Sequence, residues 1–299
     1  QERAGVADEA SRVGRIVGGR LSANVARFLA ERDLAVMGAA DAAGRVWASP
    51  LAGPPGFLTP IAEDVVRVAV SPPSEDPLAA ALAADGTAVG MLAIDLATRR
   101  RLRVNGRARA IPAWEGLGGF DVETREVYGN CQQYIHARES RHAEDGITGS
   151  APSSLLPHGN ALSADQRRWI ETADTLFIAS LHPERGADAS HRGGRPGFVR
   201  VVDASTLELP DYPGNRMFNT LGNLAAHPAA GLLFLDFADG SVLQLTGEAT
   251  ILWDAASLGA WPGAERAVRF HVAEVVERRR ALPLRWELRE RSPLTPPVR

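Results

Sequence analysis

The chain of 299 residues contains no lysine, so all 33 of its basic residues are arginines. This absence excludes a Schiff-base lysine, which would hold pyridoxal phosphate or activate a carbonyl substrate. It also excludes a P-loop nucleotide site, which needs a lysine to reach the phosphates. Any anion that this chain binds must be held by arginine, by backbone N–H groups, or by hydroxyl and amide side chains.

Cysteine is nearly absent as well. Cys131 is the one cysteine, so no disulfide can form within the chain and the fold needs no oxidising compartment. No apolar run approaches a membrane span of about 20 residues, and no signal peptide is evident. The net charge of −3 gives no basic face for nucleic acid. We therefore expect a cytoplasmic protein that binds neither nucleic acid nor membranes.

Two short arginine runs are present. Residues 99–103 hold four arginines, and residues 278–280 hold three. Charge runs of this kind are typical of solvated turns or helix ends, and we interpret both runs in that way.

The chain contains an internal repeat at a spacing of 141 residues. Leu21-Ser-Ala23 recurs as Leu162-Ser-Ala164, and Pro55-Gly-Phe57 recurs as Pro196-Gly-Phe198. Over residues 89–108, 7 of 20 positions are identical to their counterparts, where chance would give about one or two. We interpret the repeat as a tandem duplication.

Both copies show the same order of predicted elements. A short amphipathic helix opens each copy, and Ser22 and Ser163 are its expected N-caps. Short apolar runs separated by turn signals then predict antiparallel strands. The expected helices span residues 21–31 and 162–173, and the expected hairpins join 89–95 to 102–110 and 231–237 to 241–251. This pattern predicts a mainly β protein with minor α content, in which two antiparallel barrels pack as a pseudo-dimer.

The repeat and the composition set the expected domain boundaries. A linker rich in serine, glycine, proline and histidine separates the copies, and a proline-rich tail follows the second copy. The boundaries are an N-terminal helical segment at 1–20, a first barrel at 21–136, a linker at 137–161, a second barrel at 162–281 and a tail at 282–299.

The copies differ most in two loops. The second copy has Ser190-His-Arg-Gly-Gly-Arg-Pro-Gly-Phe198, where the first has Ser49-Pro-Leu-Ala-Gly-Pro-Pro-Gly-Phe57. Further on, residues 211–223 of the second copy carry an arginine and several asparagines, whereas residues 70–82 of the first carry none. Arginine forks and glycine-exposed amides are what a phosphate group needs. Solvated loops whose arginines form surface ion pairs are the alternative interpretation.

These loops resemble those of the pyridoxamine 5′-phosphate oxidase-like, FMN-binding split-barrel family. The resemblance covers roughly residues 10–280 and is most specific at 190–199, 211–216, 219–224 and 231–235. Such proteins are usually homodimers of split barrels with FMN in the cleft between subunits. The resemblance therefore implies two split β-barrels in tandem, with FMN, or FAD or another flavin, in the cleft between the halves. The oxidase proper also uses lysine on the phosphate, and its substrate motifs are not evident, so vitamin B6 oxidation is not expected.

The resemblance also implies which residues would bind the cofactor. The loop beside the flavin phosphate matches here at Ser190, His191, Arg192 and Arg195, and the second segment matches at Asn215, Arg216, Thr220 and Asn223. Ser49 is the counterpart of Ser190 in the first copy, but Leu51 and Pro54 replace the two arginines, so we expect that second flavin site to be lost or altered.

Two further residues are candidates for the wall of the pocket. Cys131 and Tyr134 follow the last strand of the first copy, from where the chain could reach across the cleft. A buried, inert thiol is the alternative for Cys131. His182 and His191 could meet, although we expect both to be exposed. The histidines form no metal-binding pattern, so no metal is expected.

Three functions remain open from the sequence. The first is an FMN-dependent oxidoreductase, whose flavin carries the redox chemistry on an unknown small molecule, with NAD(P)H or a reductase as a partner. The second is a non-catalytic flavin- or haem-binding protein, with His191 or His182 as haem ligand. The third is a structural module with an empty cleft. In each case the chain could also form a homodimer, and no catalytic acid or base can be assigned.

Overall fold

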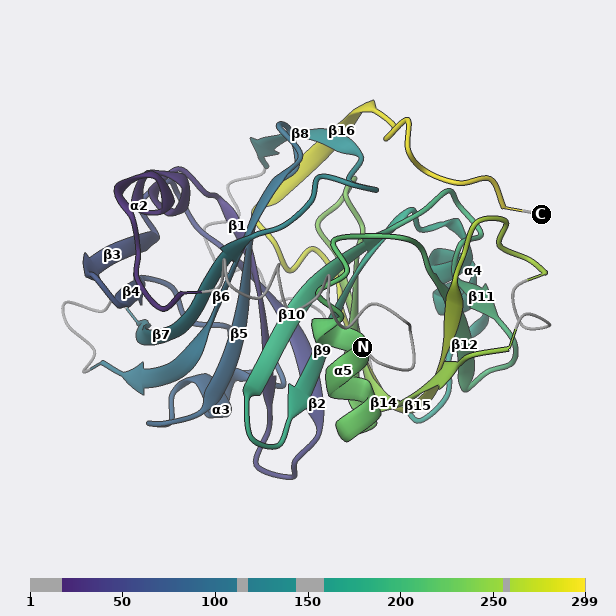
Figure 1. Ribbon diagram of the computed structural model, residues 1–299, viewed down its shortest axis with the longest axis horizontal. Helices are drawn as coiled ribbons and strands as arrows, with labels where there is room; N and C mark the ends of the chain where they lie inside the picture. The colour runs from purple at the N-terminus through teal and green to yellow at the C-terminus, as the bar shows by residue number, and fades with distance from the viewer. Residues whose placement is uncertain (1–17, 112–117, 144–158, 255–258, 299) are drawn as a thin grey trace.

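The computed structural model describes residues 18–111, 118–143, 159–254 and 259–298. The expected N-terminal helical segment at 1–20 lies almost entirely outside these ranges. The described chain is mainly β (Figure 1). Its elements are α2 (Ala23–Ala30), β1 (Leu34–Ala40), β2 (Val46–Ala52), β3 (Leu58–Ala62), β4 (Val65–Val68), α3 (Ala79–Leu82), β5 (Ala88–Asp95), β6 (Arg100–Ala110), β7 (Phe120–Gly129), β8 (Ala137–His142), α4 (Ala164–Thr172), β9 (Thr175–His182), β10 (Gly186–Gly193), β11 (Arg200–Val201), β12 (Thr206–Asp211), α5 (Asn219–Ala226), β13 (Ala229–Leu235), β14 (Val242–Leu252), β15 (Arg266–Arg278) and β16 (Leu284–Glu290).

Two seven-stranded antiparallel sheets dominate the molecule and have the same topology. The first has the order β2-β1-β5-β6-β7-β4-β3, and the second has β10-β9-β13-β14-β15-β12-β11. Each sheet curls around its own apolar core, and the two barrels lie side by side (Figure 1). The fold class predicted from the sequence, two antiparallel split barrels in tandem, is confirmed.

The local signals of the repeat are reproduced in both copies. Ser22 and Ser163 cap α2 and α4, and α4 has a complete capping box with Gln166. β6 and β14 each carry a bulge just before a glycine, Gly106 or Gly247. A Cβ atom on either glycine would overlap the backbone of the neighbouring strand, so the bulges require glycine.

The barrels meet around a pseudo-two-fold axis. Gly38 on β1 faces Ala179 on β9, its own counterpart in the repeat, and a Cβ on Gly38 would lie 2.9 Å from the Ala179 Cβ. Residues that meet their own counterparts lie on the axis of an isologous interface. On either side of this axis, Gly90 approaches the backbone of Asp188, and Gly231 approaches the backbone of Trp47. The equivalent glycines therefore allow β5 to cross β10 and β13 to cross β2.

A third apolar core fills the space between the barrels. Its fully buried side chains come from both copies and include Val36, Leu92, Phe177 and Leu233. An interface with an apolar core of this kind resembles the interior of a domain rather than a transient contact. The barrels therefore form one folding unit, and groups placed between them are held rigidly.

The structure differs from the sequence expectation in the linker and in the tail. Residues 137–142 of the expected linker form β8, and residues 284–290 of the expected tail form β16, which pairs with β8 in an antiparallel ribbon. The ribbon lies over the junction of the two barrels (Figure 1), and Trp286 contacts the edge of Phe237. β8 is short, charge-rich and without alternation, and although apolar and charged residues alternate in β16, its partner β8 lies far away in the sequence, so only the tertiary contact fixes the pair. The domain boundaries themselves stay a prediction.

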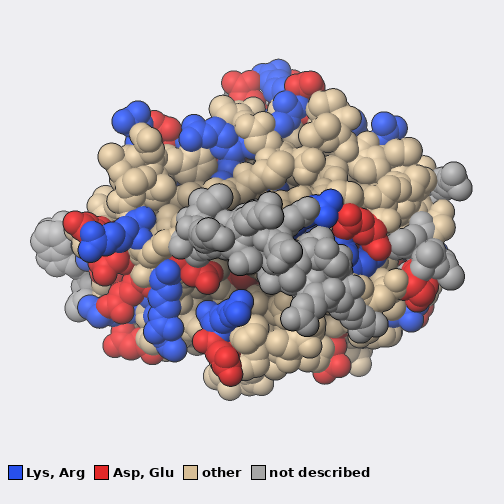
Figure 2. Space-filling model, viewed as in Figure 1, with Lys and Arg blue, Asp and Glu red and all other residues tan. Residues whose placement is uncertain are grey.

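Surface charges of both signs are mixed. On the face shown in Figure 2, acidic and basic side chains are interspersed around tan areas. Many of the arginines pair with a neighbouring carboxylate, as Arg67 does with Asp121 at 2.9 Å. Exposed pairs of this kind contribute little to stability.

We expect Gly90→Ala to destabilise the protein, because the added Cβ would overlap the backbone of Asp188 in the other barrel. Overpacking of this kind costs about 1–3 kcal/mol in free energy of unfolding, measurable by urea denaturation. Gly129→Ala is the control, since no heavy atom lies within 4 Å of the position that its Cβ would take. Equal stability of the two variants would contradict the close crossing of β5 and β10.

Candidate functional site

Two small adjoining cavities lie between the barrels, on one side of the pseudo-two-fold axis. The α5 cavity, as we call the first, has a volume of about 60 Å³ and is lined by Arg103, Arg192, Arg216, Arg266 and the start of α5. The β6 cavity has about 70 Å³ and is lined by Arg101, Asn130, Cys131, His191 and neighbouring residues. Arg103, Arg192, Tyr212, Gly214 and Asn215 line both cavities. The two cavities together form the open site, to which both copies contribute.

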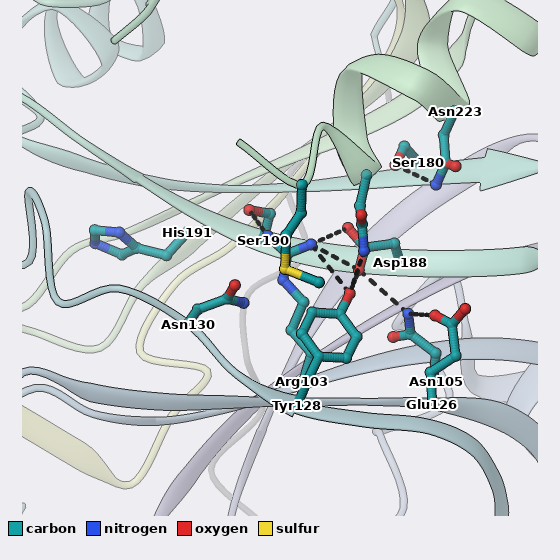
Figure 3. Close-up of polar contacts among 12 residues, drawn as sticks. Arg103, Asn105, Glu126, Tyr128, Asn130, Ser180, Asp188, Ser190, His191 and Asn223 are labelled. Carbon is teal, nitrogen blue, oxygen red and sulfur yellow. Dashed lines mark hydrogen bonds and ion pairs between the residues drawn. The ribbon is translucent and has the colours of Figure 1, made fainter. Parts of the chain in front are cut away.

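A buried polar cluster joins the barrels at the open site (Figure 3). The Arg103 guanidinium donates to both Asp188 carboxylate oxygens at 2.9 and 3.0 Å and to Ser190 Oγ at 2.6 Å. Burial alone would lower the pKa of Arg103, but Asp188 and Tyr128 beside it hold that pKa above its usual value. Burial, followed by the Asp188 charge, raises the pKa of Tyr128 to about 12. Arg103 thus stays charged and Tyr128 stays protonated.

The N-terminus of α5 faces the α5 cavity without a cap. Phe218, the N-cap residue, has φ +58° and gives no side-chain hydrogen bond to the helix. Arg216 also has a positive φ, of +56°. Non-glycine residues adopt this left-handed region at a cost, and they often do so at functional sites. The first N–H groups of a helix and its dipole favour an anion, and Phe218, Asn219, Thr220 and Leu221 all line this cavity.

The hydroxyl of Thr220 is buried at the α5 cavity. Thr220 is 2% exposed, and within the described part of the chain its Oγ1 has no hydrogen-bond partner. An unsatisfied buried hydroxyl costs about 1–3 kcal/mol. A ligand in the cavity would satisfy it.

Positive charge exceeds negative charge around the α5 cavity. Four arginines line it, against the two carboxylates of Asp211 and Glu265. Asp211 accepts from Arg266 at 3.0 Å and from Arg192 at 3.4 Å. Burial lowers the pKa of Arg192, although Asp211 opposes that effect. The cavity therefore has room and charge for one phosphate-sized anion.

The structure brings most of the predicted cofactor-binding residues together. Eight of them line the open site: Ser190, His191, Arg192, Asn215, Arg216, Thr220, Cys131 and Tyr134. Asn223 lies in an adjoining cavity of about 280 Å³, where its amide donates to Ser180 at 3.0 Å. Arg195 is exposed and lines neither cavity of the open site, and Ser49 lies at the other junction of the barrels.

The expectation that His191 is exposed was wrong, and the alternative of a buried thiol does not hold for Cys131. Cys131 is exposed and lines the β6 cavity, because it lies in the segment after β7. His191 is 4% exposed rather than solvated, because β10 lies between the barrels. His182 does not meet His191, since the two residues stand at opposite ends of the β9–β10 pairing.

The interpretation of the first arginine run as a solvated turn was wrong for Arg101 and Arg103. Both lie on β6 within the open site, and Arg103 is only 7% exposed. The alternation of side chains along β6 could have indicated their position. Leu102 and Val104 face the barrel core, so Arg101 and Arg103 lie on the opposite face of the strand. Asp188, Tyr128 and Asn130 were also not anticipated.

The equivalent position across the pseudo-two-fold axis is closed by the chain's own carboxylate. There, Ser49 Oγ donates to Asp76 at 2.5 Å, and Arg278 donates to Asp76 at 2.5 Å. Gln244, the counterpart of Arg103, donates to Ser49 at 2.9 Å. The side chains of Asp76 and Arg278 are 0% and 2% exposed, so the second arginine run is not a solvated turn at Arg278. We call this cluster of Ser49, Asp76, Gln244 and Arg278 the closed site.

Comparison with known proteins supports a family for the second half of the chain. A family model described as pyridoxamine 5′-phosphate oxidase matches residues 162–287. No curated protein matches the chain. The family resemblance seen in the sequence is thus confirmed over residues 162–287, and the first barrel repeats the topology of the second.

Several solved structures resemble part of the chain. An FAD-binding protein from Mesorhizobium loti is 15% identical, with a TM-score of 0.30, over 42% of this chain and 98% of its own. An FMN-binding protein from Syntrophomonas wolfei is 8% identical, with a TM-score of 0.29, over 38% and 84%. A protein from Clostridium acetobutylicum related to general stress protein 26 is 14% identical, with a TM-score of 0.29, over 42% and 92%. None of these likenesses assigns a residue or an activity to this chain.

The described residues contain neither a helix suited to span a membrane nor a cluster suited to bind a metal ion. None of the described helices has the length and apolar character needed to cross a membrane. Within the same part of the chain, no group of three or more histidine, cysteine and acidic side chains is placed to hold a metal ion.

We expect Asp76→Ala to lower the free energy of unfolding by about 3–5 kcal/mol, because Arg278 would remain buried without its carboxylate. Added formate should restore part of the loss by supplying a carboxylate, whereas chloride at equal ionic strength should restore less. Thermal unfolding with each salt measures both effects. Asp165→Ala removes only an exposed pair with Arg168 and should respond to neither salt. A formate-insensitive Asp76→Ala protein would contradict the closed-site geometry.

We also expect stability to fall as the pH drops from 7.5 to 5.5. Burial lowers the pKa of His191 and of His136 below the ordinary 6.5, so both rings bind a proton less readily in the folded chain than in the unfolded chain. The unfolded chain takes up these protons below pH 6.5, and stability present above that pH is lost as the pH approaches the folded-state pKa. Each ring contributes up to about 1.4 kcal/mol per pH unit. Urea denaturation at several pH values measures how the free energy of unfolding depends on pH. This dependence should be weaker for His191→Gln than for the native protein, whereas His271→Gln, which changes an exposed ring, should leave it unchanged.

Proposed function

We propose that the protein is an FMN-binding oxidoreductase that holds the cofactor phosphate in the α5 cavity between the barrels. One observation carries the proposal: the uncapped N-terminus of α5, the buried unpartnered Thr220 hydroxyl and four arginines converge on one cavity. Each of these features favours a phosphate on general grounds. The family match over residues 162–287 supports a flavin as the molecule that carries it.

The residues of the open site fit such a cofactor. Arg192 and Arg216 offer guanidinium donors, and Thr220 with the first N–H groups of α5 offers neutral ones. The single phosphate of FMN would lie in this cavity. The larger cavity next to it is lined by amides, including Asn105, Asn219 and Asn223, that can meet hydroxyl and carbonyl groups.

The chain's contribution to the reaction is to bind and orient. A bound flavin supplies hydride or electron transfer. Arg103 and Asp188 would hold the two barrels in register beside it. The buried setting strengthens each of these contacts and excludes water from the site.

The asymmetry of the two sites predicts one cofactor in each chain. In the closed site, Leu51 replaces Arg192 and Val242 replaces Arg101. The arginine that is present there, Arg278, already pairs with the Asp76 carboxylate. A second phosphate would have to displace a buried ion pair, which is strongly unfavourable. Release of the cofactor by heat and its absorbance should therefore give one flavin per chain.

The geometry disfavours haem ligation by either candidate histidine. Arg101 approaches His191 Nδ1 at 3.2 Å, and arginine can only donate, so the ring proton of neutral His191 lies on Nε2. His182 Nδ1 likewise accepts from the Glu184 and Arg185 N–H groups. Neither ring presents a free Nε2 lone pair, which a haem iron needs.

The binding test is a pair of variants on the same loops. Purified protein should be yellow, and Arg192→Ala with Arg216→Ala should weaken FMN retention at least 100-fold, because each charged hydrogen bond contributes about 1.5–3 kcal/mol. Arg195→Ala, in the same loop but exposed, should keep its flavin. Fluorescence titration of the apoprotein with FMN measures the affinity of the native protein, of the double variant and of Arg195→Ala. A colourless protein that ignores FMN and FAD would refute the proposal.

A turnover test separates the enzyme from a non-catalytic flavin carrier. Under anaerobic conditions, NADH or NADPH, or a reductase with either donor, should bleach the flavin band, and air or an acceptor should restore it. We expect this cycle to be repeatable with the native protein. A flavin that stays bound and oxidised with every donor would favour storage or sensing instead.

A further inference from the structure

The β6 cavity, next to the proposed phosphate position, contains cations and donors but no acid. Three arginines line it, and its lining includes no aspartate or glutamate among the described residues. Arg103 is paired with Asp188 and Arg192 is paired with Asp211. Arg101 differs, because the described part of the chain offers it no carboxylate within ion-pair distance.

Arg101 is held in place by neutral groups alone. Its Nε donates to the Cys131 carbonyl oxygen at 3.0 Å, and its Nη1 approaches His191 Nδ1 at 3.2 Å and the His191 carbonyl at 3.3 Å. Burial, together with the charges of Arg103 and Arg192, lowers the pKa of Arg101 to about 9. Arg101 is half-buried, and a guanidinium in such surroundings is stabilised by an incoming anion.

His191 supplies a neutral donor beside this cation. Because Nδ1 accepts from Arg101, the proton of the ring lies on Nε2, which is buried and has no hydrogen-bond partner among the described residues. The ring is 4% exposed and packs edge-on against Phe177 at 5.7 Å. Gly193 permits this arrangement, since a Cβ there would lie 3.0 Å from His191 Cε1.

Two further side chains add unpartnered polar groups to the same cavity. Tyr212 is 7% exposed, and no described residue forms a hydrogen bond with its hydroxyl. The Asn130 amide oxygen accepts from Asn215, whereas its amide nitrogen has no hydrogen bond to the residues that the structure describes. Four donor groups, from Arg101, Asn130, His191 and Tyr212, therefore line one small space. Leaving these donors unsatisfied would be costly, so the cavity is built for an acceptor-rich ligand.

A larger, more apolar cavity of about 350 Å³ adjoins the β6 cavity. It shares Arg101 and Asn130 with the β6 cavity, and its remaining lining includes Val25, Phe28 and Leu102. The phosphate of a cofactor already has a complete site at α5. The joined cavities thus have space for a different molecule with an anionic head and an apolar body.

We propose that the β6 cavity binds the carboxylate of the substrate, with Arg101 and His191 as its donors, and that the apolar body of the acid lies over Val25, Phe28 and Leu102. The substrate class is therefore a small monocarboxylic acid with an apolar portion. That the acid is a substrate rests on the proposed flavin function. The binding of a carboxylate in the β6 cavity does not depend on that function. Arg101 and His191 act as specificity-determining residues, since a neutral amide would leave the cation uncompensated.

The experiment uses benzoate, octanoate and benzamide as probes of the purified protein. Benzoate or octanoate should bind by calorimetry and perturb the flavin spectrum, whereas benzamide should not. Arg101→Gln should weaken binding of the acid at least 10-fold without changing FMN retention, and His191→Phe should weaken it several-fold. Arg107→Gln, an exposed arginine on the same strand, should change neither.

The alternative outcomes are distinct. Competition between benzoate and FMN, or loss of FMN from Arg101→Gln, would assign the β6 cavity to the cofactor and overturn this inference while leaving flavin binding intact. Equal binding of benzoate and benzamide, or no binding of either acid, would also overturn it. If the protein binds no flavin at all, the proposed function fails, and calorimetry with the flavin-free protein still decides whether Arg101 holds a carboxylate.

Discussion

The contact of Gly90 with Asp188 fixes the relation between the two barrels, and with it everything at the open site. Asp188 is packed against the backbone of β5 and held by the Arg103 guanidinium, so one residue sets both the separation and the register of the halves. A buried ion pair of this kind contributes little net stability, but loss of one partner is expensive. The ion pair acts here by positioning side chains, because Arg103 also donates to the hydroxyls of Ser190 and Tyr128.

Duplication has allowed the two junctions to diverge on one scaffold. Both are built from a serine on one barrel and a donor on the inner strand of the other, Ser190 with Arg103 and Ser49 with Gln244. At the closed site the loop before α3 brings in Asp76, which neutralises Arg278 and fills the space. At the open site the loop before α5 carries Arg216 instead, and the cavity remains. The acidic loop residue at one junction and the arginines at the other thus distinguish a filled core from an open cavity.

The sequence predicted the fold better than it predicted the site. The helices, the hairpins and the two caps all follow local rules, and the repeat doubled each signal, so they could be read without tertiary information. Strands β8 and β16 could not, because each depends on a partner about 145 residues away. The family resemblance placed the second-copy loops, and most of their residues do line the cavities.

The residues from the first copy were missed for a geometric reason. A position-by-position comparison of the copies shows which of two equivalent loops has gained arginines. A junction across a two-fold axis, however, brings together residues that are not equivalent in the two copies, and such a comparison does not pair them. Arg101 and Arg103 therefore looked like an ordinary charge run, although they complete the site of the other barrel. The burial of His191 and the exposure of Cys131 follow from the same junction, which the sequence of either copy alone does not reveal.

The absence of lysine fits the burial of the cations in this fold. Arg103, Arg138 and Arg278 are each less than 9% exposed, and each lies next to a carboxylate. A lysine ammonium loses its charge readily when buried, whereas a guanidinium keeps it and donates to several partners in one plane. Arg103 meets a carboxylate, a serine and a tyrosine together, which the compact ammonium of lysine would match less well. The same property suits Arg101, since a guanidinium can remain cationic in the β6 cavity beside two carbonyl oxygens and an imidazole.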